Sequence, residues 1–192
     1  VTDTPAEHEY INDSSVHFGT YMDRNLGALT ATPGEAGIAG LLYQWGRKDP
    51  FLASGDIASA TPNTVASSVL SEDMQWMVIP SSQVVGTVAF ATKNPTTFIT
   101  GVSPNYSWLH TPDISLWGNN KTIYDPCPAG WKVAQSELGV NLGVVFYVGE
   151  PVFTFGCGKI SYDRSNENYA YYPASGHLHF QSGDLEYVSR VG

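Results

Sequence analysis

Histidine and tryptophan side chains in two stretches are the residues of this chain best suited to contact a ligand directly. His177 and His179 are two positions apart, so on a strand both would point to one face, as metal ligands can. No acidic residue or cysteine is spaced to complete such a site, and we therefore predict an ordinary solvent-facing pair. The other stretch holds Trp108, His110 and Trp117 in a loop-like segment, where an exposed indole would stack on a sugar face. Core positions are the favoured interpretation of both tryptophans, with ligand binding as the alternative.

A polar loop at residues 163–168 supplies oxygen atoms of the kind that calcium prefers. The ligands would come from Asp163, Asn166 and Asn168. The loop lacks the glycine that an EF-hand carries at its sixth position. We therefore predict no cofactor, and calcium at these three residues is the alternative.

Signatures of common enzyme families are missing from the chain. It contains no Gly-x-Ser-x-Gly elbow, no phosphate-binding loop, no dinucleotide fingerprint and no His-Glu-x-x-His. Asp and Glu are scattered, and nothing singles out two of them as a pair for glycoside hydrolysis. We predict that the protein is not an enzyme.

The two cysteines, Cys127 and Cys157, allow either one disulfide or two free thiols, and their spacing does not decide between them. A reactive thiol at Cys157 is disfavoured, because Lys159 is the only basic residue beside it.

A rigid corner at residues 124–133 is the clearest structural signal. Two prolines bracket Cys127 and restrict its backbone. Gly130 then allows a turn before Trp131, a large side chain of the kind that a domain buries. We predict structural roles for Cys127 and Trp131, and a second core anchor at Trp45.

Asp23 and Arg24 are adjacent in a segment that reads as a turn. Opposite charges at this spacing favour an ion pair that holds the turn. A polar binding site that includes Asn25 is the alternative.

Composition limits the partners of the chain. Its 192 residues suit a single domain, and only 14% of them are charged. The net charge of −9 argues against nucleic acid and against an anionic membrane surface. No apolar run approaches the length that a membrane-spanning segment needs.

The elements predicted from local pattern are short strands between polar turns. Residues 1–16 read as an N-terminal arm or edge strand, and residues 63–70 as a short helix in a long loop. A turn at residues 94–96 leads into a strand that ends near residue 99. The other predicted strands span residues 17–22, 74–79, 84–91, 144–147, 152–155, 159–162, 169–172, 177–180 and 185–188. Both 74–79 and 84–91 read as buried strands, and the second half reads as a β-meander with hairpin turns.

Five segments in this order resemble one known family. They are residues 22–28 (MDRNLGA), 43–51 (YQWGRKDPF), 94–99 (NPTTFI), 124–131 (YDPCPAGW) and 172–177 (YPASGH). Together they resemble the Fibrobacter succinogenes major paralogous domain (FISUMP) family, which is abundant in surface proteins of gut Bacteroidetes. The resemblance covers residues 17 to 190.

The resemblance implies a single domain over residues 17–192 with a β-rich α+β fold. That fold is C-type-lectin-like, as in the formylglycine-generating enzymes. Members of the family continue past the position equivalent to Gly192 into another strand. We therefore expect this domain to lack an edge strand or to receive it from elsewhere.

The resemblance also implies a secreted or cell-surface protein of fimbrillin-like or adhesin architecture. With the charge-poor, aromatic composition, it predicts a non-catalytic adhesion domain that binds a glycan or a surface protein. The first alternative is a structural subunit of a fimbria, completed by strand addition from a neighbouring subunit. The second is a relative of the formylglycine-type enzymes, which would need a catalytic cysteine site.

Overall fold

Short strands that pair two by two make up most of the regular structure. The structure is a computed structural model that describes residues 7–11, 17–35, 37–52, 76–133, 157–161, 169–173 and 175–186. The strands in this part are β1 (Glu7–Ile11), β2 (His17–Met22), β3 (Leu41–Tyr43), β4 (Pro50–Leu52), β5 (Met77–Pro80), β6 (Thr97–Thr100), β7 (Cys157–Ser161), β8 (Tyr169–Pro173), β9 (His177–Leu178) and β10 (Leu185–Glu186). One helix, α1 (Val88–Lys93), accompanies them. The helix predicted at 63–70, the strands at 144–147 and 152–155 and the polar loop at 163–168 lie outside the described residues.

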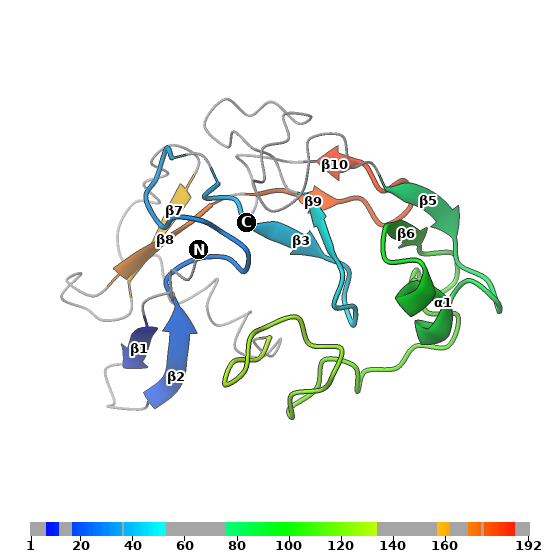
Figure 1. Cartoon of the computed structure of the whole chain (residues 1–192), viewed down its shortest axis with the longest axis horizontal. Helices are drawn as coiled ribbons and strands as arrows, with labels where there is room; N and C mark the ends of the chain where they lie inside the picture. Colours follow the sequence, from blue (N-terminus) through cyan, green and yellow to red (C-terminus); the bar gives the residue numbers. More distant parts are fainter. Residues whose placement is uncertain are drawn as a thin grey trace.

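Four of the described strand pairs are antiparallel and one is parallel. The antiparallel pairs are β1–β2, β3–β4, β7–β8 and β9–β10. The parallel pair is β5–β6, and α1 lies between its strands in the sequence, as the crossover of a parallel pair requires. Figure 1 places β5, β6 and α1 at one end of the molecule and β1, β2, β7 and β8 at the other, with β3 and β9 between them.

Several strand predictions are confirmed. The strand at 17–22 has the predicted bounds, and the turn at 94–96 leads into β6. In the second half, β7 to β10 fall on the predicted segments. They form two separate hairpins, because β8 and β9 do not pair among the described residues. The continuous meander that we predicted is therefore wrong in its pairing.

The buried strand predicted at 84–91 is wrong, because this segment leads into α1. The side chain of Thr87 accepts a hydrogen bond from the Phe90 amide, which is the N-cap arrangement that starts a helix. The Asn94 amide donates back to the Phe90 and Ala91 carbonyls, and Pro95 follows. The Thr87 N-cap and the Asn94-Pro95 C-terminus thus favour a helix more strongly than the β-branched residues favour a strand.

The strand predicted at 74–79 is present as β5, but it is not buried. Met77 is 63% exposed and Val78 is exposed as well. Trp76, just before the strand, donates its indole N–H to the Gly183 carbonyl at 3.2 Å. The strand therefore lies at the surface, and Trp76 joins it to the segment that contains β10.

The main core lies between α1 and the chain that follows β6. Its buried side chains are Ala91, Ile99, Trp108, Leu109 and Leu116. An aromatic group lies beside it, in which the ring of Phe51 meets the rings of Phe98 and Trp76 edge to face at 5.4 and 5.7 Å. These contacts join β4 and β6, which are far apart in the sequence, so the core depends on long-range packing.

The last third of the chain is tied to the first by hydrogen bonds. The Ser175 hydroxyl donates to the Ala39 carbonyl at 2.9 Å, and the Tyr172 hydroxyl donates to the Met22 carbonyl. Ile38 and Ala39 are buried at this junction, where Tyr171 packs against them. The junction holds β8 and the residues after it close to β3.

Candidate ligand-binding groove

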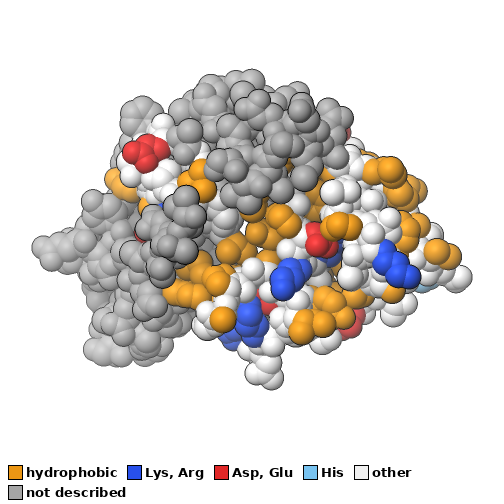
Figure 2. All heavy atoms as spheres, viewed as in Figure 1, with side chains coloured by type: hydrophobic (Ala, Val, Ile, Leu, Met, Phe, Trp, Pro, Cys, Tyr) orange, Lys and Arg blue, Asp and Glu red, His pale blue; other side chains and the backbone are white. Residues whose placement is uncertain are grey.

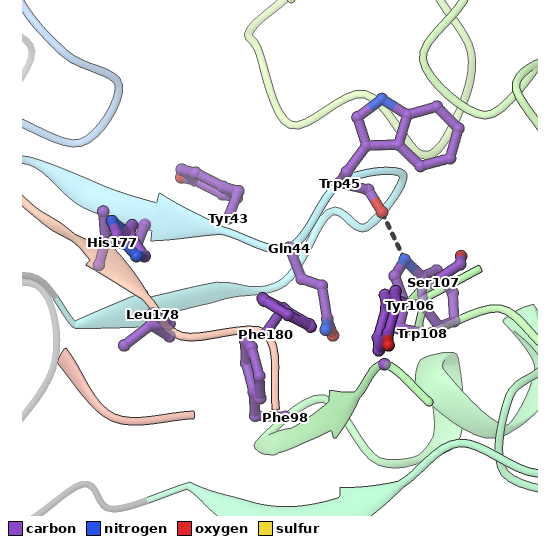
Figure 3. A pocket seen from close by; sticks show the side chains of 12 residues that line it. Tyr43, Gln44, Trp45, Phe98, Tyr106, Ser107, Trp108, His177, Leu178 and Phe180 are labelled. Atoms are coloured by element: carbon purple, nitrogen blue, oxygen red, sulfur yellow. Dashed lines mark hydrogen bonds between the residues drawn. The ribbon is translucent and has the colours of Figure 1, made fainter. Parts of the chain in front are cut away.

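A groove of about 320 Å³ opens between β3, the end of β6 with the loop after it, and β9 with the residues that follow. Aromatic side chains dominate its walls, as Figure 3 shows: Tyr43, Trp45, Phe98, Tyr106, Trp108 and Phe180. The other lining residues are Leu42, Gln44, Gly101, Ser107, His177 and Leu178. The volume is at the lower end of the range of about 300–1,000 Å³ that is usual for small-molecule sites. Three chain segments that are distant in sequence therefore meet at one aromatic depression.

The wall made by Tyr106 and Phe180 is held by the backbone of Gly101. The Gly101 amide donates to the Phe180 carbonyl at 2.8 Å. A Cβ at Gly101 would lie 1.9 Å from the Tyr106 carbonyl oxygen, so only glycine allows the loop to fold back this closely. The Tyr106 and Phe180 rings then meet edge to face at 5.5 Å. Both rings remain exposed, Tyr106 by 50%.

Trp108 lies at the base of the groove and belongs to the core. It is 5% exposed, and its indole N–H donates to the Trp45 carbonyl at 2.6 Å (Figure 3). Ser81 fixes the same residue from behind, with its hydroxyl on the Trp108 carbonyl at 2.7 Å. The core position predicted for Trp108 is confirmed, although the residue also lines the groove.

Trp45 is not the core anchor that we predicted, because 40% of it is exposed. Its indole points away from Tyr106 and Phe180 in Figure 3, and lies 6.2 Å from the ring of Trp117. Trp117 is half-buried and donates its N–H to the Tyr124 carbonyl at 2.9 Å. The carbonyl of Trp45, rather than its ring, serves the core by accepting the bond from Trp108.

Arg47 forms a buried hydrogen-bonding centre beside the groove. The residue is 2% exposed, and one terminal nitrogen donates to the Thr97 carbonyl at 2.6 Å and to the Gln44 side chain at 3.0 Å. The other donates to the carbonyls of Asn94 and Pro95 and, at 3.5 Å, to Asp49. The guanidinium carbon lies 5.4 Å from the Phe51 ring centre and 5.8 Å from that of Trp108.

This arrangement makes Arg47 a structural residue. Burial lowers the pKa of Arg47, and the carboxylate of Asp49 opposes that shift. Its two terminal nitrogens are occupied by protein acceptors, while Nε is buried without a hydrogen-bond partner among the described residues. Gln44 is occupied too, because its amide nitrogen donates to the Ile99 carbonyl at 2.7 Å. Neither side chain is therefore available to a ligand, although Gln44 lines the groove.

Hydroxyl groups and the His177 imidazole are the side-chain polar groups that the groove offers. The Ser107 hydroxyl oxygen accepts from the Leu109 amide at 3.1 Å, and its hydrogen has no acceptor among the described residues. Burial raises the pKa of Tyr43 to about 12, and the nearby Cys127 acts in the same direction, so the phenol stays neutral. Tyr106 adds a third hydroxyl. No Asp, Glu, Lys or Arg is among the lining residues in the part of the chain that the structure describes.

The histidine candidates are divided by the structure. His177 is exposed and lines the groove. We predicted that His179 would point to the same face of a strand as His177. Because β9 ends at Leu178, His179 is not part of that strand. The His179 ring packs 4.9 Å from that of Phe180 and its Nδ1 lies 3.3 Å from the Ser182 hydroxyl. His110 is exposed and is not a lining residue. Within the described ranges, no group of three or more His, Cys, Asp or Glu could hold a metal ion.

The predicted Asp23–Arg24 pair is confirmed. The guanidinium makes two hydrogen bonds to the Asp23 carboxylate, at 2.8 and 3.0 Å, and Asp23 is buried. Asn25 donates weakly to the Ser175 hydroxyl at 3.4 Å, which adds a contact to the junction between the first and last thirds. The pair therefore holds a turn away from the groove lining.

The corner at 124–133 is organised by Asp125. Its carboxylate accepts from the Cys127 amide at 2.8 Å, the Val133 amide at 2.9 Å and the Lys121 ammonium at 3.0 Å. Burial alone would raise the pKa of Asp125, but these three bonds together hold it below its usual value. The predicted turn at Gly130 is present with φ of 86°, while Trp131 is only half-buried.

Cys127 carries a free, half-buried thiol. Burial raises its pKa to about 11, and Asp125 acts in the same direction. The thiol is therefore protonated at neutral pH. The side chain of Cys157 is outside the described structure.

The sequence signals missed most of the groove residues, among them Tyr43, Tyr106, Ser107 and Phe180. Tyr43 stands in the segment 43–51, in which only Trp45 was given an individual role from the sequence. Tyr106 follows the Pro104-Asn105 turn, and its position across from Phe180 depends on a hydrogen bond between residues 101 and 180. No local pattern reports such a contact.

Comparison with family models, curated proteins and solved structures finds no match to the chain. The resemblance to the Fibrobacter family and the C-type-lectin-like fold therefore stay predictions. Among the described residues, no helix is both long and apolar enough to cross a membrane.

Proposed function

We propose that this chain is a non-catalytic binding domain of a bacterial cell surface, which recognises a glycan or a protein partner through the aromatic groove. The observation that carries the proposal is the exposed aromatic wall of Tyr106 and Phe180 over a base formed by Trp108. Aromatic side chains exposed around a depression offer apolar contact area together with a polar rim, as binding sites require.

Two features support binding rather than catalysis. The Cys127 thiol has a raised pKa, whereas a nucleophilic cysteine needs a lowered one. Apart from His177 and the hydrogen-bonded Gln44, the polar lining groups of the groove are hydroxyls, which suit hydrogen bonding better than proton transfer at neutral pH. The secreted or surface location belongs to the same proposal and is supported by the family resemblance.

The test is binding of the purified chain to arrayed glycans and to immobilised extracellular matrix proteins, with and without a calcium chelator. We expect saturable binding that Tyr106→Ala and Phe180→Ala weaken by about 10-fold, since each removes a large apolar contact. Ile114→Ala is the matched control, because Ile114 is 85% exposed and does not line the groove. Binding that neither groove variant changes would refute the role of the groove.

A structural subunit is the second candidate, and β5 favours it. In the described structure β5 pairs only with β6, and it carries exposed Met77 and Val78. An exposed apolar edge strand accepts a strand from another chain readily. If the protein assembles in this way, sedimentation will show oligomers that grow with concentration, and Val78→Lys will return them to monomer. A monomer at every concentration would exclude this candidate.

A further inference from the structure

Building on the proposed function, we infer that the groove selects an uncharged sugar, as a single ring or a disaccharide, and discriminates against glycans that carry a carboxylate or sulfate. The inference rests on the absence of Asp, Glu, Lys and Arg from the described lining, on the bonding of Arg47 to protein acceptors, and on the hydroxyl groups that remain. The modest volume of about 320 Å³ matches the end of a glycan chain.

An anionic ligand finds little counter-charge in this part of the structure, because His177 is the one basic side chain among the described lining residues. The described lining residues include no Lys or Arg, and the chain as a whole carries a net charge of −9. The terminal nitrogens of the buried Arg47 donate hydrogen bonds to protein carbonyls and to the Gln44 side chain. A carboxylate that enters the groove would lose water without gaining an ion pair to Lys or Arg, which is costly.

A cationic ligand is disfavoured by the ring geometry. Aromatic cages bind quaternary ammonium groups by turning several ring faces toward one point. Here the Tyr106 and Phe180 rings are inclined at 78° and meet edge to face, so one ring face is already covered. Trp45, a further aromatic of the lining, turns its indole away from this pair (Figure 3). The described lining also has no carboxylate to compensate a buried positive charge.

The hydroxyls match what a sugar presents. Tyr43, Tyr106 and Ser107 can each donate and accept a hydrogen bond, as sugar hydroxyls do. The raised pKa of Tyr43 keeps its phenol able to donate at neutral and mildly alkaline pH. The exposed ring of Tyr106 supplies the apolar surface on which the C–H face of a pyranose can lie. On the face seen in Figure 2, the apolar side chains of the described residues lie interspersed with Lys, Arg, Asp and Glu side chains.

The experiment uses an array of paired glycans, in which each neutral oligosaccharide has a partner with one added sialic or uronic acid. Choline is titrated separately by calorimetry. We expect the best neutral member to bind at least about 10-fold more tightly than its acidic partner, and choline not to bind. Tyr43→Phe and Ser107→Ala should each weaken neutral binding by about 3- to 10-fold, the net effect of one hydrogen bond. Ile114→Ala should leave it unchanged.

The outcomes separate this inference from the proposed function. Acidic members that bind as tightly as their neutral partners, with binding lost in Tyr106→Ala, would overturn the inference while the groove remained a binding site. Choline binding that Tyr106→Ala abolishes would do the same. If no glycan binds but a matrix protein binds through Tyr106, the sugar inference falls and the binding function stands. No binding of any of these probes would overturn both.

Discussion

The Arg47 centre and the groove beside it use their polar atoms in opposite ways. The side chains of Arg47 and Gln44 use nearly all their polar atoms in hydrogen bonds to backbone carbonyls and to each other. In the groove, the Ser107 hydroxyl hydrogen has no acceptor among the described residues, and Tyr106 is 50% exposed. A buried polar group must find a hydrogen-bond partner within the protein, whereas an exposed group can bond to water or to a ligand.

The same contrast holds for the tryptophans. Trp108 and Trp45 are joined by one hydrogen bond, yet one is buried and the other is 40% exposed. Residue type alone therefore does not separate scaffold from binding surface in this molecule. The separation comes from whether each side chain finds its partners within the fold.

Arg47→Ala should have the largest effect, because it removes the donors that serve the Thr97, Asn94 and Pro95 carbonyls. We expect the free energy of unfolding to fall by about 3–5 kcal/mol, as when one member of a buried polar network is deleted. Urea denaturation measures this, with Lys93→Ala on the exposed end of α1 as control. A loss below about 1 kcal/mol would show that Arg47 is not a structural centre.

Asp125→Asn should be next in size. An amide cannot accept from both the Cys127 and Val133 amides as the carboxylate does, and we expect a loss of about 2 kcal/mol at pH 7. Because the folded-state pKa of Asp125 is lowered, its contribution is present above the unfolded pKa of about 4 and is lost as pH falls through the folded value. Denaturation curves at pH 7 and pH 3 test this. The difference between wild type and variant should shrink at the lower pH, and a constant difference would contradict the assignment.

Tyr106→Ala should weaken binding with little loss of stability, in contrast to the large loss of stability predicted for Arg47→Ala. The side chain is half exposed, so we expect stability to change by less than about 0.5–1 kcal/mol. Binding should weaken by about 1.5 kcal/mol, or 10-fold, because the ring is a main contact for the ligand. Thermal denaturation and calorimetry on the same sample measure the two effects. A variant that loses much stability and no affinity would place Tyr106 with the scaffold.

Tyr43→Phe should have the smallest effect on stability, and this stability effect appears only at alkaline pH. The folded-state pKa of Tyr43 is raised to about 12, so its phenol favours folding fully below the unfolded pKa of about 10. That stability is lost as pH rises through the folded value. The melting temperature of wild type should therefore fall more steeply between pH 10 and pH 12 than that of the variant. Parallel curves would show that Tyr43 does not titrate as inferred.

Local pattern predicted the strands better than the groove. The bounds of β2 were predictable because its alternating residues end at a turn of polar residues and glycine. The start of α1 was not, since the Thr87 cap competes with β-branched residues around it. Exposure of Trp45 and burial of Trp108 were predictable only in part, because they depend on a contact across 63 residues.

The groove residues were the hardest to predict from sequence. Tyr106 and Phe180 meet because the Gly101 amide donates a hydrogen bond to the Phe180 carbonyl. The local sequence around either residue does not predict that contact. The predicted ion pair of Asp23 and Arg24 was easier, because its partners are adjacent in the chain.

The Gly101–Phe180 hydrogen bond has a consequence for ligand discovery. It brings together segments that an unfolded chain holds far apart, so only the folded protein presents the groove. Any compound that fills it must then shift the folding equilibrium by mass action, by about 2.7 kcal/mol at a concentration 100 times its Kd. A melting-temperature screen would therefore detect ligands of unknown chemistry without an assay for function. Substitution of Gly101 by alanine should remove such shifts, since it separates the two walls.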